Sequence, residues 1–150
     1  MEAPPYVAVV GAGGAVAADV LAEAEAVGAE LARRGAVLVC GGLGGVMAAA
    51  CRGARAEGGV TLGILPGTDR AAANPWVSVA VATGLGELRN GLVVRSADAV
   101  VAIGGEYGTL SEIALALKAG VSVVGLRSWD IRGVLEADDP AAAVVLALGV

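Results

Sequence analysis

The sequence has no histidine and no phenylalanine, and only 3% of its 150 residues are aromatic. Without histidine it cannot form a Ser-His-Asp triad, a Cys-His pair or a His-ligated metal site. Lysine is nearly absent as well, because Lys118 is the only lysine among the 10 basic residues. Any acid–base chemistry therefore depends on Asp, Glu, Lys, Tyr or Cys side chains.

Positive charge is scarce too, because 10 basic residues stand against 15 acidic ones, a net charge of −5. A basic face for nucleic acid or for an anionic membrane is therefore not expected. Backbone amides can still hold a small anion locally. The two cysteines, Cys40 and Cys51, lack metal-ligand spacing, and so few cysteines fit a reducing compartment. We expect a cytoplasmic protein.

Apolar residues, in contrast, are abundant: 57% of the chain is hydrophobic and the mean hydropathy is +0.77. The longest uncharged stretch, residues 35–51, is interrupted by glycines in its middle, whereas a membrane span needs about 20 mostly apolar residues. The N-terminus carries Glu2 and two prolines instead of a basic region, so no signal peptide is expected. A sheet buried on both faces accounts for the apolar excess.

Apolar runs and helical patterns alternate along the whole chain. This order predicts a single α/β domain, residues 1–150, with a Rossmann-like, doubly wound parallel sheet of about six strands and helices on both faces. Asp139 before Pro140 predicts the start of the last helix. The expected strands are residues 6–10, 37–40, 60–65, 77–83, 99–103 and 121–126, and the other expected helices are residues 16–34, 46–57, 85–96 and 109–118.

Four glycine-bearing loops follow expected strands: residues 11–14, 41–45, 66–68 and 104–109. In an open parallel sheet such loops share the edge where ligands bind. Backbone N–H groups and helix N-termini there favour an anion, most plausibly a phosphate. Each loop alone is more simply a tight turn, but four converging loops favour a site. The dinucleotide fingerprint and the P-loop sequence are both absent.

Three side chains near these loops have alternative interpretations. Arg89 is either a solvated helix arginine or a clamp for an oxyanion, since its planar fork suits phosphate or carboxylate. Glu112 fits a capping box with Thr109 as N-cap, and a carboxylate there would also sit at the mouth of the site. Glu106 would repel a phosphate, so it is expected to point away or to meet a sugar hydroxyl.

Two segments, Gly-Gly-Leu-Gly-Gly-Val-Met at residues 41–47 and Gly-Gly-Glu-Tyr-Gly-Thr-Leu-Ser-Glu at residues 104–112, resemble the paired signatures of the LOG (lonely guy) family. The resemblance covers about residues 6–126. It implies a Rossmann-like homodimer that hydrolyses the N-glycosidic bond of cytokinin riboside 5′-monophosphates. Arg89 matches the catalytic arginine and Glu112 the catalytic glutamate. The family's older label, "possible lysine decarboxylase", implies pyridoxal phosphate, which is not expected with Lys118 late in a helix.

The sequence departs from the LOG pattern at Asn90, Gly104, Glu106 and Ser111. It looks closer to a shorter branch that includes the molybdenum cofactor carrier proteins, which bind a phosphorylated pterin. Two functions therefore stay open. One is a binding or carrier protein for a nucleotide monophosphate or the molybdenum cofactor. The other is a phosphoribohydrolase that uses Arg89 and Glu112.

Under either function the expected partner is a small phosphorylated ligand, with no required cofactor and no metal ligands. Nucleic acid and membrane are not expected as partners. The chain is expected to form a homodimer or a higher homo-oligomer. The residues expected to contact the ligand lie in the glycine loops and at the helix starts: Gly11, Gly13, Gly41, Gly42, Gly44, Gly45, Met47, Pro66, Gly67, Thr68, Asn90, Gly104, Gly105, Glu106, Tyr107, Gly108 and Thr109.

Overall fold

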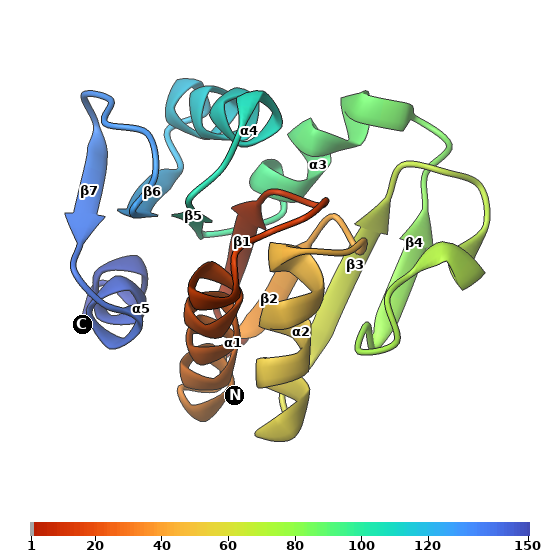
Figure 1. Ribbon diagram of the computed structural model, residues 1–150, viewed down its shortest axis with the longest axis horizontal. Helices are drawn as coiled ribbons and strands as arrows, with labels where there is room; N and C mark the ends of the chain where they lie inside the picture. The colour runs from red at the N-terminus through yellow and green to blue at the C-terminus, as the bar shows by residue number, and fades with distance from the viewer. Residues whose placement is uncertain (1) are drawn as a thin grey trace.

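A seven-stranded sheet in the order β4-β3-β2-β1-β5-β6-β7 forms the centre of the molecule (Figure 1). The computed structural model describes residues 2–150, and every neighbouring pair of strands is parallel. This confirms the expected fold class. The strands are β1 (Tyr6–Gly11), β2 (Val37–Cys40), β3 (Thr61–Leu65), β4 (Val79–Ala82), β5 (Ala99–Ile103), β6 (Ser122–Leu126) and β7 (Val134–Ala137).

Helices cover both faces of this sheet (Figure 1). Along β1, Val7 and Val9 pack against helices on one face, and Ala8 and Val10 against helices on the other. This alternation buries both sides of the strand and explains its unbroken apolar run. One layer comprises α1 (Ala18–Arg33), α2 (Val46–Ala56) and α5 (Pro140–Leu148), and the other comprises α3 (Arg89–Arg95) and α4 (Tyr107–Lys118).

The helices α1 and α2 touch backbone to backbone. A Cβ added to Gly28 would lie 1.9 Å from the Ala50 carbonyl oxygen, and one added to Gly53 would lie 1.9 Å from the Glu25 carbonyl oxygen. Only glycine permits such an approach. These two glycines therefore fix the spacing of the two helices that begin just after the β1 and β2 loops.

The structure differs from the expected elements in two places. β7 is not among the six expected strands. It is a four-residue edge strand with Leu135 and Glu136 exposed, so it carries no apolar run. The helix expected over residues 85–96 is divided into a 3-10 turn, η2 (Gly86–Leu88), and α3. Positive φ angles at Gly84 and Gly86, +67° and +60°, keep regular α-helix from starting earlier.

The remaining element ends agree with expectation to within two residues. Asp139 caps α5 as predicted, because its carboxylate accepts a hydrogen bond from the Ala142 N–H at 2.8 Å. Gly35, with φ +75°, follows the end of α1. The connection between β3 and β4 contains a short 3-10 turn, η1 (Arg70–Ala72), capped by Asp69.

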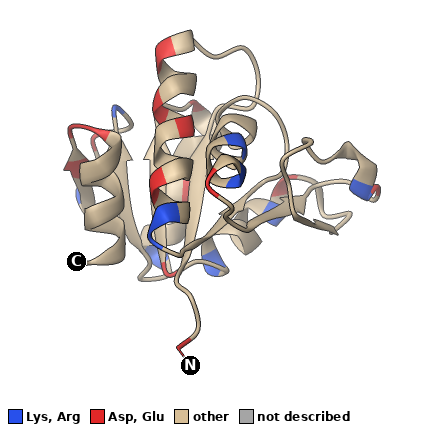
Figure 2. Cartoon of the chain, turned by 90° about the horizontal axis from the view of Figure 1, so that it is seen from below, with Lys and Arg blue, Asp and Glu red and all other residues tan. Residues whose placement is uncertain are grey.

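The surface helices differ in charge (Figure 2). α5 carries no charged residue, whereas α1 carries four acidic ones. Glu30 of α1 pairs with Arg33 and Arg34 at 3.2 Å each, but exposed pairs of this kind contribute little to stability. None of the carboxylates on α1 lines the pocket described below.

No helix within residues 2–150 has both the length and the apolar character needed to cross a membrane.

Candidate functional site

A cavity of about 290 Å³ lies at the carboxyl ends of the central strands, beside the junction of β1 and β5. The chain passes from β1 outward to β4, then returns to β5 on the other side of β1. The loops after β1 and β5 therefore diverge at this junction, which is the place where open α/β sheets bind ligands. The lining residues are Val9, Val10, Gly11, Ala12, Gly13, Gly14, Ala15, Gly41, Met47, Arg89, Asn90, Glu106, Gly108, Thr109 and Glu112.

The loop after β1 forms one wall and is held against the start of α2. The Val46 N–H donates to the Ala12 carbonyl at 3.0 Å. Gly45 allows this contact, because its φ is +62° and an added Cβ would lie 2.2 Å from the Ala12 oxygen. Gly11 is equally constrained, with Val46 carbon atoms 2.7 Å from its would-be Cβ. The loop is thus a fixed part of the wall.

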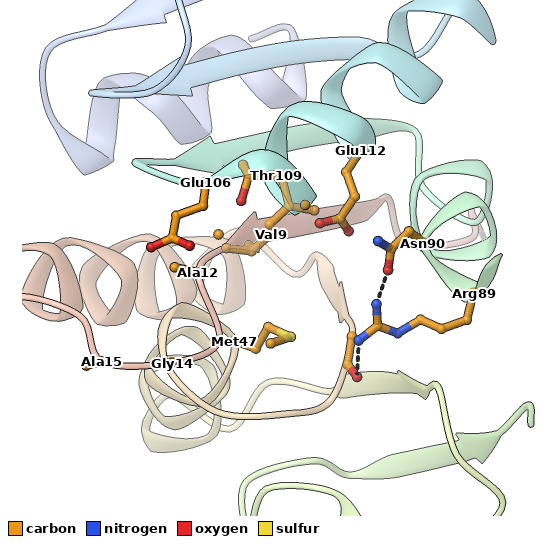
Figure 3. A pocket seen from close by; sticks show the side chains of 15 residues that line it. Val9, Ala12, Gly14, Ala15, Met47, Arg89, Asn90, Glu106, Thr109 and Glu112 are labelled. Carbon is orange, nitrogen blue, oxygen red and sulfur yellow. Dashed lines mark hydrogen bonds between the residues drawn. The ribbon is translucent and has the colours of Figure 1, made fainter. Parts of the chain in front are cut away.

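Arg89, the first residue of α3, is held by backbone carbonyls at the ends of two strands, and Figure 3 shows its guanidinium beside Asn90. Its Nε donates to the Ile64 carbonyl at 2.9 Å and its Nη2 to the Gly41 carbonyl at 3.4 Å. Its Nη1 donates to the Asn90 side-chain oxygen. A Cβ on Gly41 would lie 2.6 Å from Nη2, so glycine is required there for the guanidinium to reach its place.

Glu112 of α4 faces the same cavity as Arg89 (Figure 3) and is only 8% exposed. Burial raises the pKa of its carboxyl group to about 7, and the charge of Arg89 opposes that rise. The ion pairs found among residues 2–150 do not include Glu112 or Arg89. A guanidinium and a carboxyl group that share a cavity without pairing can both act on a bound ligand.

The N-cap and the first two turns of α4 present Glu106, Thr109 and Glu112 along one wall (Figure 3). The capping box expected for Thr109 and Glu112 is wrong, because α4 begins at Tyr107 and its N-cap is Glu106, without a side-chain cap. The helix starts two residues earlier than the pattern indicated. Thr109 therefore lies inside the first turn, 3% exposed, and Glu112 turns toward the cavity. Glu106 also lines the cavity instead of pointing away.

The structure brings about half of the expected site residues together. Those that line the cavity are Gly11, Gly13, Gly41, Met47, Arg89, Asn90, Glu106, Gly108, Thr109 and Glu112. Those that do not line it are Gly42, Gly44, Gly45, Pro66, Gly67, Thr68, Gly104, Gly105 and Tyr107.

Five lining residues were not among the expected ones: Val9, Val10, Ala12, Gly14 and Ala15. Val9 and Val10 end a strand that the sequence marks only as apolar core. The other three belong to the loop after β1: Ala12 and Gly14 lie within the glycine loop expected over residues 11–14, and Ala15 follows it. Their contribution is backbone and small side chains, which carry no chemical signature in a sequence.

The cavity thus combines three chemical properties. It has a fixed guanidinium that suits an oxyanion, backbone from a glycine-containing loop before α1, and a carboxyl group with its pKa near neutrality. Among residues 2–150 no group of three or more Cys, Asp or Glu is arranged to hold a metal ion. The site therefore suits a small anionic ligand and proton transfer to or from it.

Comparison with known proteins places the chain in a family. Residues 4–147 match the sequence model of the SLOG cluster4 family. The chain belongs to this family. The match confirms the expected resemblance to LOG-like Rossmann proteins.

Two solved structures resemble this member of the SLOG cluster4 family over nearly its whole length. The molybdenum cofactor binding protein from the phototrophic bacterium Rippkaea orientalis is 34% identical, with a TM-score of 0.92, over 99% of this chain and 98% of that one. The molybdenum cofactor carrier protein from Chlamydomonas reinhardtii is 36% identical, with a TM-score of 0.89, over 98% and 97% of the two chains.

A protein of uncharacterised function from Archaeoglobus fulgidus is 46% identical over 101 residues. The alignment covers 67% of this chain and 66% of that relative, slightly less than two thirds of its length.

Proposed function

We propose that this protein binds a phosphorylated ligand of the nucleotide or pterin type, as a carrier of the molybdenum cofactor. The observation that carries the proposal is the fixed Arg89 guanidinium at a cavity lined by the backbone of residues 11–15. Such a cavity suits a phosphate. The likeness to molybdenum cofactor binding and carrier proteins supports the pterin form of the ligand.

The two carboxyl groups in the cavity bear on how well an anion fits. With its pKa raised to about 7, Glu112 is about half protonated at neutral pH and repels an anion less than an ordinary glutamate does. Glu106 lines the same wall, where it is placed to accept hydrogen bonds from hydroxyl or amino groups of the ligand. The residues that would hold the phosphate are then Arg89, Asn90 and the backbone of residues 11–15.

The test is retention of isolated molybdenum cofactor through gel filtration, measured as molybdenum per protein. We expect the wild-type protein to retain it and Arg89→Ala to retain at least tenfold less, since a charge-assisted hydrogen bond is worth about 1.5–3 kcal/mol. Arg70→Ala, an exposed arginine of η1 outside the cavity, should retain it like wild type. Equal retention by Arg89→Ala, with its melting temperature unchanged, contradicts the proposal.

A second candidate function is a phosphoribohydrolase that cleaves the N-glycosidic bond of nucleoside 5′-monophosphates. The observation that favours it is the buried Glu112 carboxyl group, whose raised pKa near 7 suits general acid–base catalysis at neutral pH. Glu112 would assist attack of water on the anomeric carbon, and Arg89 would stabilise the developing charge. No cofactor is needed for this reaction.

Turnover separates the two candidates. Chromatography measures the release of free base from AMP or from cytokinin riboside 5′-monophosphates. Release by the wild-type protein that is abolished in Glu112→Gln would establish the hydrolase. Binding of these ligands that survives Glu112→Gln, without any release of base by wild type, favours the carrier.

Self-association and a cytoplasmic location stay predictions. Three leucines on α3, α4 and the turn before α3 are exposed, namely Leu88, Leu92 and Leu115. A second copy of the chain could cover them in a homodimer or higher homo-oligomer.

A further inference from the structure

The segment that joins β5 to α4, residues 104–106, has an unusual backbone. Gly104 and Gly105 both have positive φ angles, +54° and +114°, which only glycine adopts readily. The N-cap of α4, Glu106, makes no side-chain cap hydrogen bond. Two consecutive glycines and an uncapped helix start leave this segment with a large conformational entropy to lose. Something outside it must hold the first turn of α4 in place.

Ser128, in the loop after β6, makes the first contact with this segment. Its hydroxyl donates to the Gly104 carbonyl at 2.6 Å. The N–H of the same glycine donates to the Leu126 carbonyl at 3.1 Å. Both polar backbone groups of Gly104 are therefore bound to the end of β6 or the loop that follows it.

Trp129 makes the second contact, one residue further along the loop. Its indole Nε1 donates to the Glu106 carbonyl at 3.3 Å. Its ring stacks on Tyr107, with centroids 6.2 Å apart and an angle of 28° between the planes. Tyr107, the first residue of α4, is 82% exposed, and its ring lies against that of Trp129.

The loop that makes these contacts is itself anchored. Arg127 Nε donates to a Glu23 carboxylate oxygen of α1 at 2.8 Å. The segment over residues 104–106 is thus held from β6 and, through Arg127, from α1. Glu106 of this segment lines the cavity, as do Gly108 and Thr109 just after it.

We propose that Ser128 and Trp129 are positioning residues, which act through the backbone of residues 104–106 to set the first turn of α4 for ligand binding. Neither side chain lines the cavity, so each acts through another residue. The inference rests on the proposed function for its ligand, and on the two hydrogen bonds for its geometry.

The experiment compares conservative variants with matched controls. Ser128→Ala removes the hydroxyl, and Trp129→Phe removes the indole N–H but keeps an aromatic ring to stack. Ser96→Ala matches the first variant, because Ser96 also donates its hydroxyl to a backbone carbonyl at 2.6 Å, that of Leu92, away from the cavity. Trp76→Phe matches the second, since Trp76 contacts Arg52 and does not line the cavity.

Two quantities are measured. The first is hydrogen–deuterium exchange of the amides over residues 104–113 in ligand-free protein, a range that includes the hydrogen-bonded N–H groups of Gly104 and Leu110. The second is the dissociation constant for AMP and for the molybdenum cofactor. We expect Ser128→Ala and Trp129→Phe to speed exchange in this segment at least tenfold and to weaken binding at least fivefold. We expect the two control variants to change neither, while all four variants keep a similar melting temperature.

Unchanged exchange over residues 104–113 in both site variants overturns the inference. Faster exchange without a loss of affinity also overturns the inference. The loop with Ser128 and Trp129 would then order residues 104–106 without affecting ligand binding. If the wild-type protein binds neither AMP nor the molybdenum cofactor, the proposed function fails. The exchange measurement, which needs no ligand, still decides whether the loop holds the helix start.

Discussion

The loop after β1 and the loop after β3 both contain glycine and follow buried strands, but only the first lines the cavity. The loop over residues 66–68 is instead joined to the chain after β4. The Gly84 N–H donates to the Gly67 carbonyl at 2.8 Å, and the Gly86 N–H to the Pro66 carbonyl at 2.9 Å. It therefore positions the turn that leads into α3, and it reaches the site only through Arg89.

Strand order explains the difference between these loops. β1 and β5 are neighbours at the point where the chain reverses its direction across the sheet, whereas β3 lies two strands away from β1, roughly 10 Å. Loops at the reversal diverge and leave a crevice. Loops that follow strands laid down in one direction pack onto one another. Glycine content alone is thus no measure of proximity to the site.

The largest expected effect comes from comparing Gly45, the N-cap of α2 that packs against the loop after β1, with Gly67 of the loop after β3. Gly45→Ala puts a Cβ 2.2 Å from the Ala12 oxygen at a φ of +62°, and should lower the free energy of unfolding by at least about 3 kcal/mol. Gly67→Ala meets nothing within 4 Å and should change stability by less than about 1 kcal/mol. Urea denaturation measures the free energy of unfolding of both variants. Equal stability of the two variants would contradict the difference in packing at Gly45 and Gly67.

The second prediction concerns the buried carboxyl group at the cavity. The pKa of Glu112 is raised from 4.5 to about 7, so the folded protein binds a proton that the unfolded chain releases between these pH values. The free energy of unfolding therefore falls as pH rises through this window, by about 3 kcal/mol. Glu112→Gln does not titrate and should gain that amount relative to wild type between pH 4 and pH 8.

Urea denaturation at several pH values between 4 and 8 measures this gain. Glu87→Gln, which removes an exposed carboxylate on η2, should follow the wild-type pH dependence. A wild-type protein whose stability is constant or rises from pH 5 to pH 7, relative to Glu112→Gln, would contradict the assignment of a buried, half-protonated carboxyl group.

The smallest expected effect separates Thr109, in the first turn of α4 at the cavity, from Thr68 on the loop after β3. Thr109→Val keeps the shape of a buried side chain but removes a hydroxyl at the cavity. It should weaken binding of the phosphorylated ligand about fivefold, the value of one hydrogen bond of about 1 kcal/mol. Thr68→Val is the matched control outside the cavity. Titration calorimetry measures the dissociation constants of both variants, and Thr68→Val should have the wild-type value. An equal loss of affinity in both variants would contradict the placement of Thr109 at the ligand site and of Thr68 outside it.

Much of the fold could be predicted from local patterns. The apolar runs of β1, β2 and β5 mark strands buried on both faces, and Asp139 with Pro140 marks the start of α5. β7 could not be predicted in this way, because an edge strand with Leu135 and Glu136 exposed has no apolar pattern. The start of α4 was misplaced because Thr109 and Glu112 fit a capping box as well as they fit a cavity wall.

The sequence predicted the type of site, but only some of the residues that line it. Arg89 and Glu112 stood out by residue type and by their place near glycine loops. Which glycines approach the cavity depends on distances between loops far apart in the sequence. The positioning residues proposed above, Ser128 and Trp129, could not be found from a pattern, because their effect passes through the backbone of another segment.

The sequence by itself determined a parallel α/β chain with glycine loops after its strands, one guanidinium and two glutamates, Glu106 and Glu112, near them, and no histidine to share their chemistry. Those properties follow from composition and from short-range periodicity. The tertiary structure alone decided that β1 meets β5, that Arg89 reaches the Gly41 carbonyl, and that Glu112 is buried with a pKa near 7. Burial and proximity arise only when distant segments pack, and they are what turn a glutamate into a candidate acid or base.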